Sequence, residues 1–342
     1  MYSKKLGRIL LGFYSHNPNV SSVIQRRPST CPFSWSSACK HRKQLLQRTT
    51  IVSSERSVLL CEMSTQSASN TTVDPEEVRR FQALASKWWD EQGEFAALHS
   101  MNDLRVPFIR DNLMSLHREC QPGRPLGGLK ILDVGCGGGL LTEPLARLGG
   151  HVLGVDPVEN SISLARLHSS RDPELGGRLR YRACTVEELL GSEEDVRGGE
   201  EEKEAGEGPF DAVVASEVVE HLADLETFAF CCGHLIKPGG SLFITTINKT
   251  NLSYALAIVA AEQILRIVPQ GTHDWDKFIS PADLERLLEP HGFSVQTVRG
   301  MLYNPVTGSW CWSDNTEINY ALHAVKAAEE PPHRQAEPEG RS

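Results

Sequence analysis

The stretch Leu129-Lys-Ile-Leu-Asp-Val-Gly-Cys-Gly-Gly-Gly139 decides the fold. A short apolar run that ends in a glycine cluster is typical of a buried strand followed by a tight loop, and a helix is expected to begin near Leu140. Glycines in such a loop let the backbone approach a ligand without a Cβ in the way. The stretch therefore predicts an open α/β sheet that binds a ligand where its first strand ends.

Short apolar runs alternate with helical patterns along the rest of the chain. Six further strand candidates are residues 151–155, 179–183, 210–215, 241–246, 294–300 and 318–324. They predict a Rossmann-like, seven-stranded, mostly parallel sheet with helices on both faces. Because no helix separates the last two candidates, these are expected to form an antiparallel edge.

Two helices are expected before the sheet, over about residues 75–89 and 103–117. Asp74, Pro75 and Glu77 are suited to the N-cap, the first turn and the N3 position of the first helix. The domain organisation that follows is an N-terminal helical segment, 71–122, and a main α/β domain, 123–328. A Gly- and Glu-rich insertion at 191–208 and the tail at 329–342 are expected to be disordered, because such compositions bury little apolar surface.

The composition excludes several classes of protein. The chain has 342 residues, is 40% hydrophobic and carries a formal charge of −9, which argues against nucleic acid as a main partner. No run reaches the roughly 18 apolar residues of a spanning helix. Nine cysteines without any C-x-x-C pair are consistent with reduced thiols.

The basic residues are concentrated at the start of the chain. Residues 1–54 contain nine Lys or Arg and no Asp or Glu, so residues 55–342 carry about −18. Together with the apolar run that ends at Tyr14, this pattern predicts a disordered mitochondrial presequence over 1–70. A basic tail without a targeting role is the alternative.

The spacing of the glycine loop distinguishes between nucleotide ligands. A dinucleotide fingerprint that began at Gly135 would need glycine at position 140, which is Leu140. Asp133 with Gly135, Gly137 and the two neighbouring glycines instead resembles the first motif of class I S-adenosylmethionine-dependent methyltransferases.

Acidic residues at the ends of the next strands support the same ligand. Asp156 ends the second strand and is placed to accept hydrogen bonds from both ribose hydroxyls, while Asp133 would face the sulfonium and amino group. Glu187 and Glu188, after the third strand, either approach the adenine amino group or are solvated acids at a helix start.

A second cluster of polar residues follows the fourth strand, in Ser216-Glu-Val-Val-Glu-His221. If this segment turns into a helix, Glu217, Glu220 and His221 have the i, i+3, i+4 spacing that places side chains on one face. Two carboxylates and an imidazole suit a divalent cation or a general base. From the spacing alone, solvated acids and a helix-start histidine are an equally good interpretation.

Five segments together resemble the ubiquinone-biosynthesis O-methyltransferase family. They are Asp-Val-Gly-Cys-Gly-Gly-Gly, Ser-Glu-Val-Val-Glu-His, Leu-Ile-Lys-Pro-Gly-Gly, Ile-Leu-Arg-Ile-Val-Pro-Gln-Gly-Thr-His-Asp and Leu-Tyr-Asn-Pro. The resemblance runs from about residue 74 to 326, and its most specific part is 264–278 with Tyr303-Asn304-Pro305.

This resemblance implies methyl transfer from S-adenosylmethionine to a catechol hydroxyl of polyprenylated intermediates, at two steps of coenzyme Q synthesis. The implied substrates are 3,4-dihydroxy-5-polyprenylbenzoate and demethylubiquinol. It also implies a peripheral position on the matrix side of the mitochondrial inner membrane, in a complex with other coenzyme Q biosynthesis proteins. Methylation of another small substrate, or a non-catalytic scaffold that binds S-adenosylmethionine, remains as an alternative.

Site residues follow from the resemblance position by position. The cofactor residues are Arg105, a glycine of the loop, Asp156 and Ser216, and a divalent cation, Mg²⁺ with Zn²⁺ as the alternative, falls on Glu217, Glu220 and His221. His221, or alternatively His273 with Asp274, would accept the hydroxyl proton. The mixed apolar and charged segment at 249–271 is expected to be a lid over the site or a helix that contacts the membrane surface.

Overall fold

The computed structural model describes residues 71–117, 123–196, 209–250, 253 and 277–328. The contacts divide the chain into Met1–Ala68 and Ser69–Ser342, and the described residues all belong to the second unit. The predicted presequence, the tail and nearly all of the 249–271 segment lie outside them, and so do His273 and Asp274. Among the described helices, none combines the length and the apolar character needed to cross a membrane.

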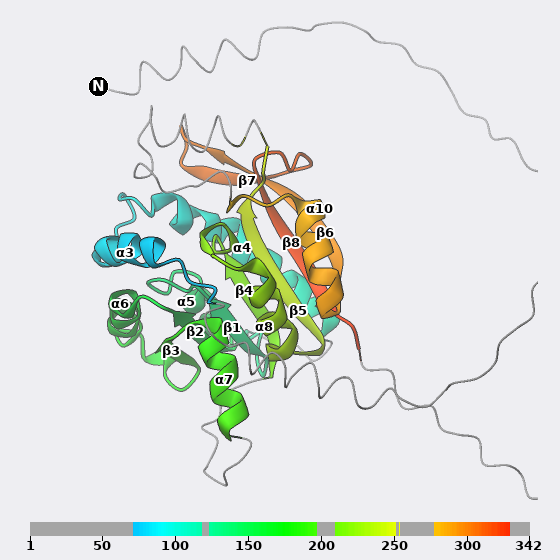
Figure 1. Ribbon diagram of the computed structural model, residues 1–342. Coiled ribbons are helices and arrows are strands. Elements are labelled where there is room, and N and C mark those ends of the chain that lie inside the picture. Colours follow the sequence, from blue (N-terminus) through cyan, green and yellow to red (C-terminus); the bar gives the residue numbers. More distant parts are fainter. Residues whose placement is uncertain (1–70, 118–122, 197–208, 251–252, 254–276, 329–342) are drawn as a thin grey trace, which may run out of the picture. The chain divides into compact units, whose positions relative to one another are not determined.

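The core of the fold is an eight-stranded sheet with the order β3-β2-β1-β4-β5-β8-β6-β7 (Figure 1). Neighbouring strands from β3 to β5 pair in parallel, and β8, β6 and β7 are antiparallel. The strands are β1 Lys130–Val134, β2 His151–Asp156, β3 Leu179–Ala183, β4 Phe210–Ser216, β5 Ile236–Ile247, β6 Phe293–Asn304, β7 Ser309–Ser313 and β8 Asn319–Lys326. The predicted α/β fold with an antiparallel edge is confirmed.

The predicted number of seven strands is wrong, because β7 is an eighth. Gly308, whose φ of +67° suits a tight turn, lets the chain fold back so that β7 pairs with β6. Trp310 and Trp312 are two positions apart in β7, so their side chains lie on the same face of the strand. The indole of Trp310 donates to the carbonyl of Ala97, and the ring of Trp312 lies 5.4 Å from that of Phe108. Packing against a helix distant in sequence therefore stabilises this short strand.

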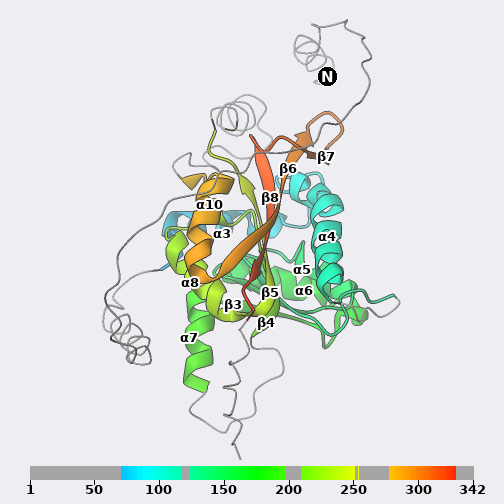
Figure 2. The ribbon, with the colours of Figure 1, turned by 90° about the vertical axis from the view of Figure 1, so that its right-hand side faces the viewer.

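Helices cover both faces of the sheet, with α4, α5 and α6 on one side and α7, α8 and α10 on the other (Figure 2). Their bounds are α3 Pro75–Leu84, α4 Ala96–Leu116, α5 Thr142–Arg147, α6 Glu159–Ser169, α7 Val186–Val196, α8 Leu225–Leu235 and α10 Pro281–Leu288. Four 3₁₀ turns are η1 Ala85–Lys87, η2 Pro173–Leu175, η3 Val219–His221 and η6 Glu289–His291. The central strands are buried on both faces, as Ile131, Leu132 and Val213 show with 0% exposure, which explains their continuous apolar runs.

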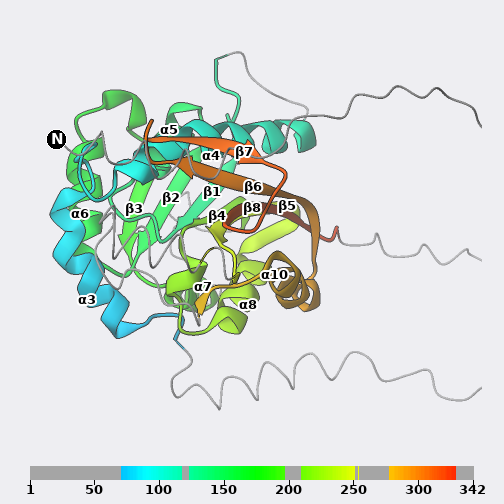
Figure 3. The ribbon, with the colours of Figure 1, turned by 90° about the horizontal axis from the view of Figure 1, so that it is seen from above.

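Helix α7 extends further than predicted. It runs to Val196, so the insertion expected to be disordered over 191–208 begins as helix, and residues 197–208 lie outside the described part. The predicted α3 is present, capped by the Asp74 side chain, which accepts from the Glu76 N–H at 2.8 Å. Helix α3 lies beside α6 (Figure 3), so the N-terminal segment packs onto the α/β domain.

Candidate active site

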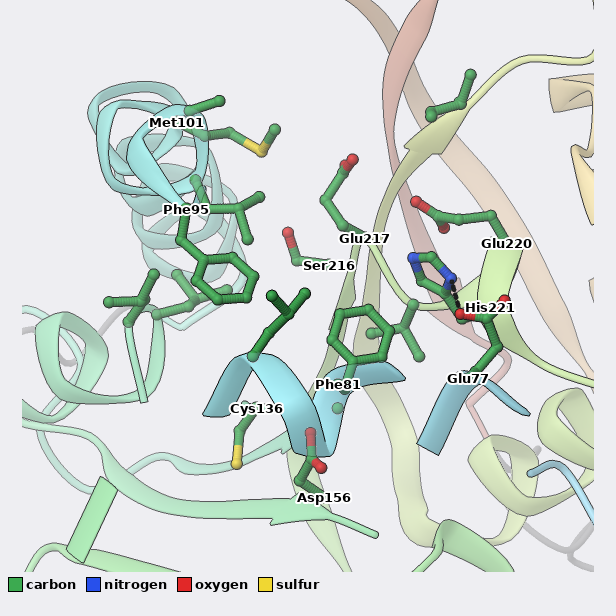
Figure 4. Close-up of a pocket in the computed structure, with 18 of the residues that line it drawn as sticks. Glu77, Phe81, Phe95, Met101, Cys136, Asp156, Ser216, Glu217, Glu220 and His221 are labelled. Carbon is green, nitrogen blue, oxygen red and sulfur yellow. Dashed lines mark ion pairs between the residues drawn. The ribbon is translucent and has the colours of Figure 1, made fainter. Parts of the chain in front are cut away.

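A cavity of about 400 Å³ lies where β1, β2 and β4 end, and residues of α3 and α4 contribute to its wall (Figure 4). The predicted residues Asp133, Gly135, Asp156, Ser216 and Glu217 all line it. This is the position where open α/β sheets bind ligands.

The glycine loop packs against aromatic side chains that leave no room for a Cβ. Gly137 has φ +53°, and a Cβ there would lie 2.4 Å from the ring of Trp88. Gly139 has φ +88°, and its Cβ would lie 2.2 Å from the hydroxyl of Tyr181. Both positions therefore require glycine for conformation and for space.

Asp156 and Asp133 are two buried carboxylates beside this loop. Asp156 accepts the N–H groups of Val158 at 2.8 Å and Gly137 at 3.0 Å, and Asp133 accepts the hydroxyl of Thr142 at 2.6 Å. Burial is the main reason that the pKa of each is raised to about 6. Each oxygen of Asp156 retains a lone pair for a further donor, as a ribose hydroxyl requires.

Arg105 extends from α4 into the same end of the cavity. Its guanidinium donates to Asn102 Oδ1 at 2.7 Å, to Ser216 Oγ at 2.8 Å and to the Leu98 carbonyl at 3.3 Å. Burial lowers the pKa of Arg105 to about 10, against the opposing charges of Asp133 and Glu217. Arg105 therefore remains a cation beside two acidic groups.

A chain of hydroxyls connects Arg105 to Glu217. Thr245 donates to Glu217 Oε1 at 2.8 Å and lies 2.7 Å from Ser216 Oγ, so Ser216, which accepts from Arg105, is the donor to Thr245. Glu217 has φ +57°, an uncommon conformation for a residue with a side chain. Strained backbone of this kind occurs frequently at functional sites.

Glu217, Glu220 and His221 would share one face only if the segment were an α-helix, and it is not. The left-handed conformation of Glu217 ends the strand, and only Val219–His221 is helical, as a single 3₁₀ turn. Glu220 instead accepts the hydroxyl of Thr246 at 2.8 Å, while Glu217 binds Thr245, the neighbouring residue of β5. Successive residues of a strand point to opposite sides, so the two carboxylates reach the cavity from different directions.

One ring nitrogen of His221 faces helix α3. Its Nδ1 lies 3.2 Å from Oε2 of Glu77, and the ring of Phe81 meets its ring edge-on with centroids 5.1 Å apart (Figure 4). Across the described ranges, no three His, Cys, Asp or Glu side chains are grouped so that they could hold a metal ion. Glu217 and Glu220 are close enough to each other for the charge of Glu217 to act on Glu220.

Glu220 is fully buried, and this affects its charge. Its pKa is raised well above the ordinary value by burial and by the charge of Glu217, against the hydrogen bond from Thr246. A second carboxylate nearby opposes ionisation. Glu220 therefore holds a proton more readily than a solvated carboxylate does.

Of the two acids that follow β3, Glu187 binds within the protein, whereas Glu188 is an exposed acid at a helix start, as one of the two interpretations expected. Glu187 accepts the hydroxyls of Thr71 and Thr72 at 2.9 and 2.7 Å, and so anchors the N-terminal segment. Glu188 forms a reciprocal cap with Thr185 at the start of α7. Glu77, expected only as an N3 acid, reaches the site. Nothing in the sequence around Glu77 predicts its contact with His221, which lies 144 positions further along the chain.

Comparisons with known proteins agree with this site. Residues 107–298 match the protein family described as a methyltransferase domain. The mitochondrial ubiquinone biosynthesis O-methyltransferase of Homo sapiens is 63% identical over 261 residues, which cover 76% of this chain and 67% of that protein. The Rattus norvegicus protein of the same name is 59% identical, with 76% and 72% covered. The ubiquinone biosynthesis O-methyltransferase of Azorhizobium caulinodans is 45% identical, with 74% and 94% covered.

A parallel sheet with this glycine loop, in a chain with these relatives, defines a class I S-adenosylmethionine-dependent methyltransferase. Within that class, the chain belongs to the ubiquinone biosynthesis O-methyltransferase family. The resemblance inferred from the sequence is confirmed.

The affinity for S-adenosylmethionine is expected to depend on pH through Asp133 and Asp156. In their predicted roles the ionised carboxylates would stabilise the sulfonium and accept the ribose hydroxyls, and the pKa of each is raised to about 6. The dissociation constant should therefore rise as the pH falls below about 6, by up to about tenfold per pH unit for each group. Calorimetric titrations between about pH 5 and 7.5 measure this. A constant affinity over that range would contradict the assignment, and Asp156→Asn should reduce the slope.

Proposed function

We propose that this chain methylates a catechol hydroxyl on polyprenylated precursors of ubiquinone, at two steps of the synthesis. The proposed substrates are 3,4-dihydroxy-5-polyprenylbenzoate and demethylubiquinol. The names of the relatives support ubiquinone synthesis, and the mammalian names support a mitochondrial location. We place the enzyme peripherally on the matrix side of the inner membrane, with other proteins of the same synthesis as its partners.

The observation that carries this proposal is a cavity with two chemically different ends. Asp156 lies at one end, and the carboxylates of Glu217 and Glu220 lie at the other (Figure 4). The wall also includes Phe81, Leu302, Tyr303 and Trp310, which suit a prenylated aromatic ring. A methyl donor and an apolar diol can thus be held in one space.

We infer that Glu217 and Glu220 bind a divalent cation, for which Mg²⁺ is the best match. Mg²⁺ is commonly held by one or two carboxylates together with substrate oxygens, and Glu217 and Glu220 are two carboxylates that line the same cavity. The Nδ1 of His221 is directed to Glu77, so only its Nε2 could face the cation. When bound, such a cation lowers the pKa of a catechol hydroxyl, ordinarily roughly 10 as in tyrosine.

The side chains of the protein position the two reactants. Asp156 holds the ribose, Arg105 and Asp133 hold the methionine end of the cofactor, and the hydroxyl chain through Ser216 and Thr245 keeps Glu217 in place. His221 lies beside Glu220 and would accept the hydroxyl proton. Alignment of the catechol oxygen with the sulfonium methyl then contributes much of the rate.

Transfer of a labelled methyl group to a short-chain prenyl catechol tests the proposal. We expect an O-methylated product, loss of activity with EDTA and recovery with Mg²⁺, because the catechol oxygen must lose its proton before it attacks. The position of the label, determined by NMR, separates O-methylation from C- or N-methylation. Absence of the product would overturn the proposed substrate class, and unchanged activity in EDTA would overturn the role of a cation.

A further inference from the structure

The contact between Glu77 and His221 joins helix α3 to the turn after β4. Oε2 of Glu77 lies 3.2 Å from Nδ1 of His221, and the two side chains are only 9% and 14% exposed. Nδ1 is buried and has no aligned hydrogen-bond partner within the described part of the chain. The carboxylate of Glu77 is therefore the nearby acceptor, and a small rotation of the ring would align Nδ1–H with it.

Two basic side chains, Arg80 and Lys277, hold the carboxylate of Glu77 in place. Arg80 donates to both carboxylate oxygens, at 3.1 and 3.0 Å, and Lys277 Nζ lies 3.7 Å from Oε1. Lys277 also binds Asp74, the N-cap of α3, at 2.6 Å. Although burial opposes ionisation, the contacts with His221, Arg80 and Lys277 lower the pKa of Glu77, so the group that faces Nδ1 is a carboxylate.

Helix α3 holds the imidazole at a second point. Phe81 follows Glu77 by one helical turn, on the same face of α3, and its ring meets the His221 ring edge-on at an interplanar angle of 85°. Figure 4 shows the imidazole between Glu77 and Glu220, with its second nitrogen on the side of Glu217 and Glu220. The orientation of the ring is thus set by two side chains of α3.

We propose that Glu77 is a positioning residue for His221. By accepting the Nδ1–H, it fixes the tautomer that carries the lone pair on Nε2 and aims that lone pair into the cavity. The hydrogen bond of one ring nitrogen decides which nitrogen is protonated, and carboxylates that hold an active-site histidine in this way orient the ring. The orientation of His221 by Glu77 does not depend on the proposed function. The proposed function enters only in naming the catechol hydroxyl as the group that Nε2 faces.

Substitutions at Glu77 test the proposal in the full-length chain. Glu77→Ala should lower kcat for a short-chain prenyl catechol by about 10- to 100-fold and leave the dissociation constant of S-adenosylmethionine within about twofold. Glu77→Gln retains an acceptor oxygen and should recover part of the loss. Glu76→Gln, on the exposed side of the same helix, is the matched control and should resemble the wild type.

A double-mutant cycle shows whether Glu77 acts through His221. If it does, Glu77→Ala should cause no further loss of kcat when it is added to His221→Ala. Losses that multiply would overturn the proposal, as would a Glu77→Ala enzyme with the kcat of the Glu76→Gln control.

NMR of the ring nitrogens gives a readout that does not depend on turnover. We expect His221 to show a proton on Nδ1 in the wild type and a mixture of tautomers in Glu77→Ala. Identical His221 spectra in both would overturn the proposal. If the spectra change as expected but the wild type does not methylate the catechol, the positioning role stands and the proposed substrate class fails.

Discussion

Glu217→Gln is expected to lower kcat by about 100-fold or more, because it removes one of the two carboxylates proposed to hold the cation that stabilises the deprotonated catechol oxygen. The dissociation constant of S-adenosylmethionine should stay within about threefold, since the substitution leaves the proposed cofactor residues Asp133 and Asp156 unchanged. The glutamine can occupy the same backbone conformation as Glu217 and still accept from Thr245. Steady-state kinetics and calorimetry on the same preparation separate the two effects.

Glu285→Gln provides the matched control for this substitution. Glu285 is an exposed acid of α10 and lies outside the cavity wall, so its loss should change neither quantity. An equal weakening of turnover and cofactor binding in Glu217→Gln would contradict the separation of the cavity into two ends. A kcat near that of the control would contradict the role of Glu217 itself.

Arg105→Lys is expected to weaken S-adenosylmethionine binding by about 100-fold and to lower the free energy of unfolding by about 3 kcal/mol. The planar guanidinium donates to Asn102, Ser216 and the Leu98 carbonyl at once. An ammonium group cannot match that geometry, and Asp133 would be left buried with a poorer partner. Calorimetry measures the affinity, and urea denaturation measures the stability.

Arg110→Lys is the control on the same helix. Arg110 pairs with its neighbour Asp111 at the surface, and exposed pairs contribute at most about 1 kcal/mol. Its substitution should leave the affinity unchanged. If Arg105→Lys bound S-adenosylmethionine as tightly as the Arg110 variant, Arg105 would not belong to the cofactor site.

The features that the sequence predicted correctly are those with local causes. The glycine loop follows β1 directly, and Asp133 and Asp156 lie at the ends of adjacent parallel strands, so strand order alone brings them together. Arg105 and Ser216 came from the family resemblance, and their contact at 2.8 Å supports both positions.

The incorrect predictions depend on contacts between distant segments. The spacing of Glu217, Glu220 and His221 implies a common face only if the backbone is α-helical, and the left-handed Glu217 prevents this. The strand β7 is stabilised because its Trp310 and Trp312 pack against α4. Glu77 has the sequence context of a helix-start acid, and only the packing of α3 brings it to His221.

The anchorage of Thr71 and Thr72 on Glu187 limits where the chain can be trimmed. Thr72 also accepts from the Ala223 N–H at 2.9 Å, and Val73 bridges to Leu222 next to His221. A protease that cut after Val73 would remove these anchors, which precede the helix that carries Glu77 and Phe81. A cut before Thr71 would preserve every one of these contacts, so removal of the predicted presequence is compatible with an intact site only when it stops short of Thr71.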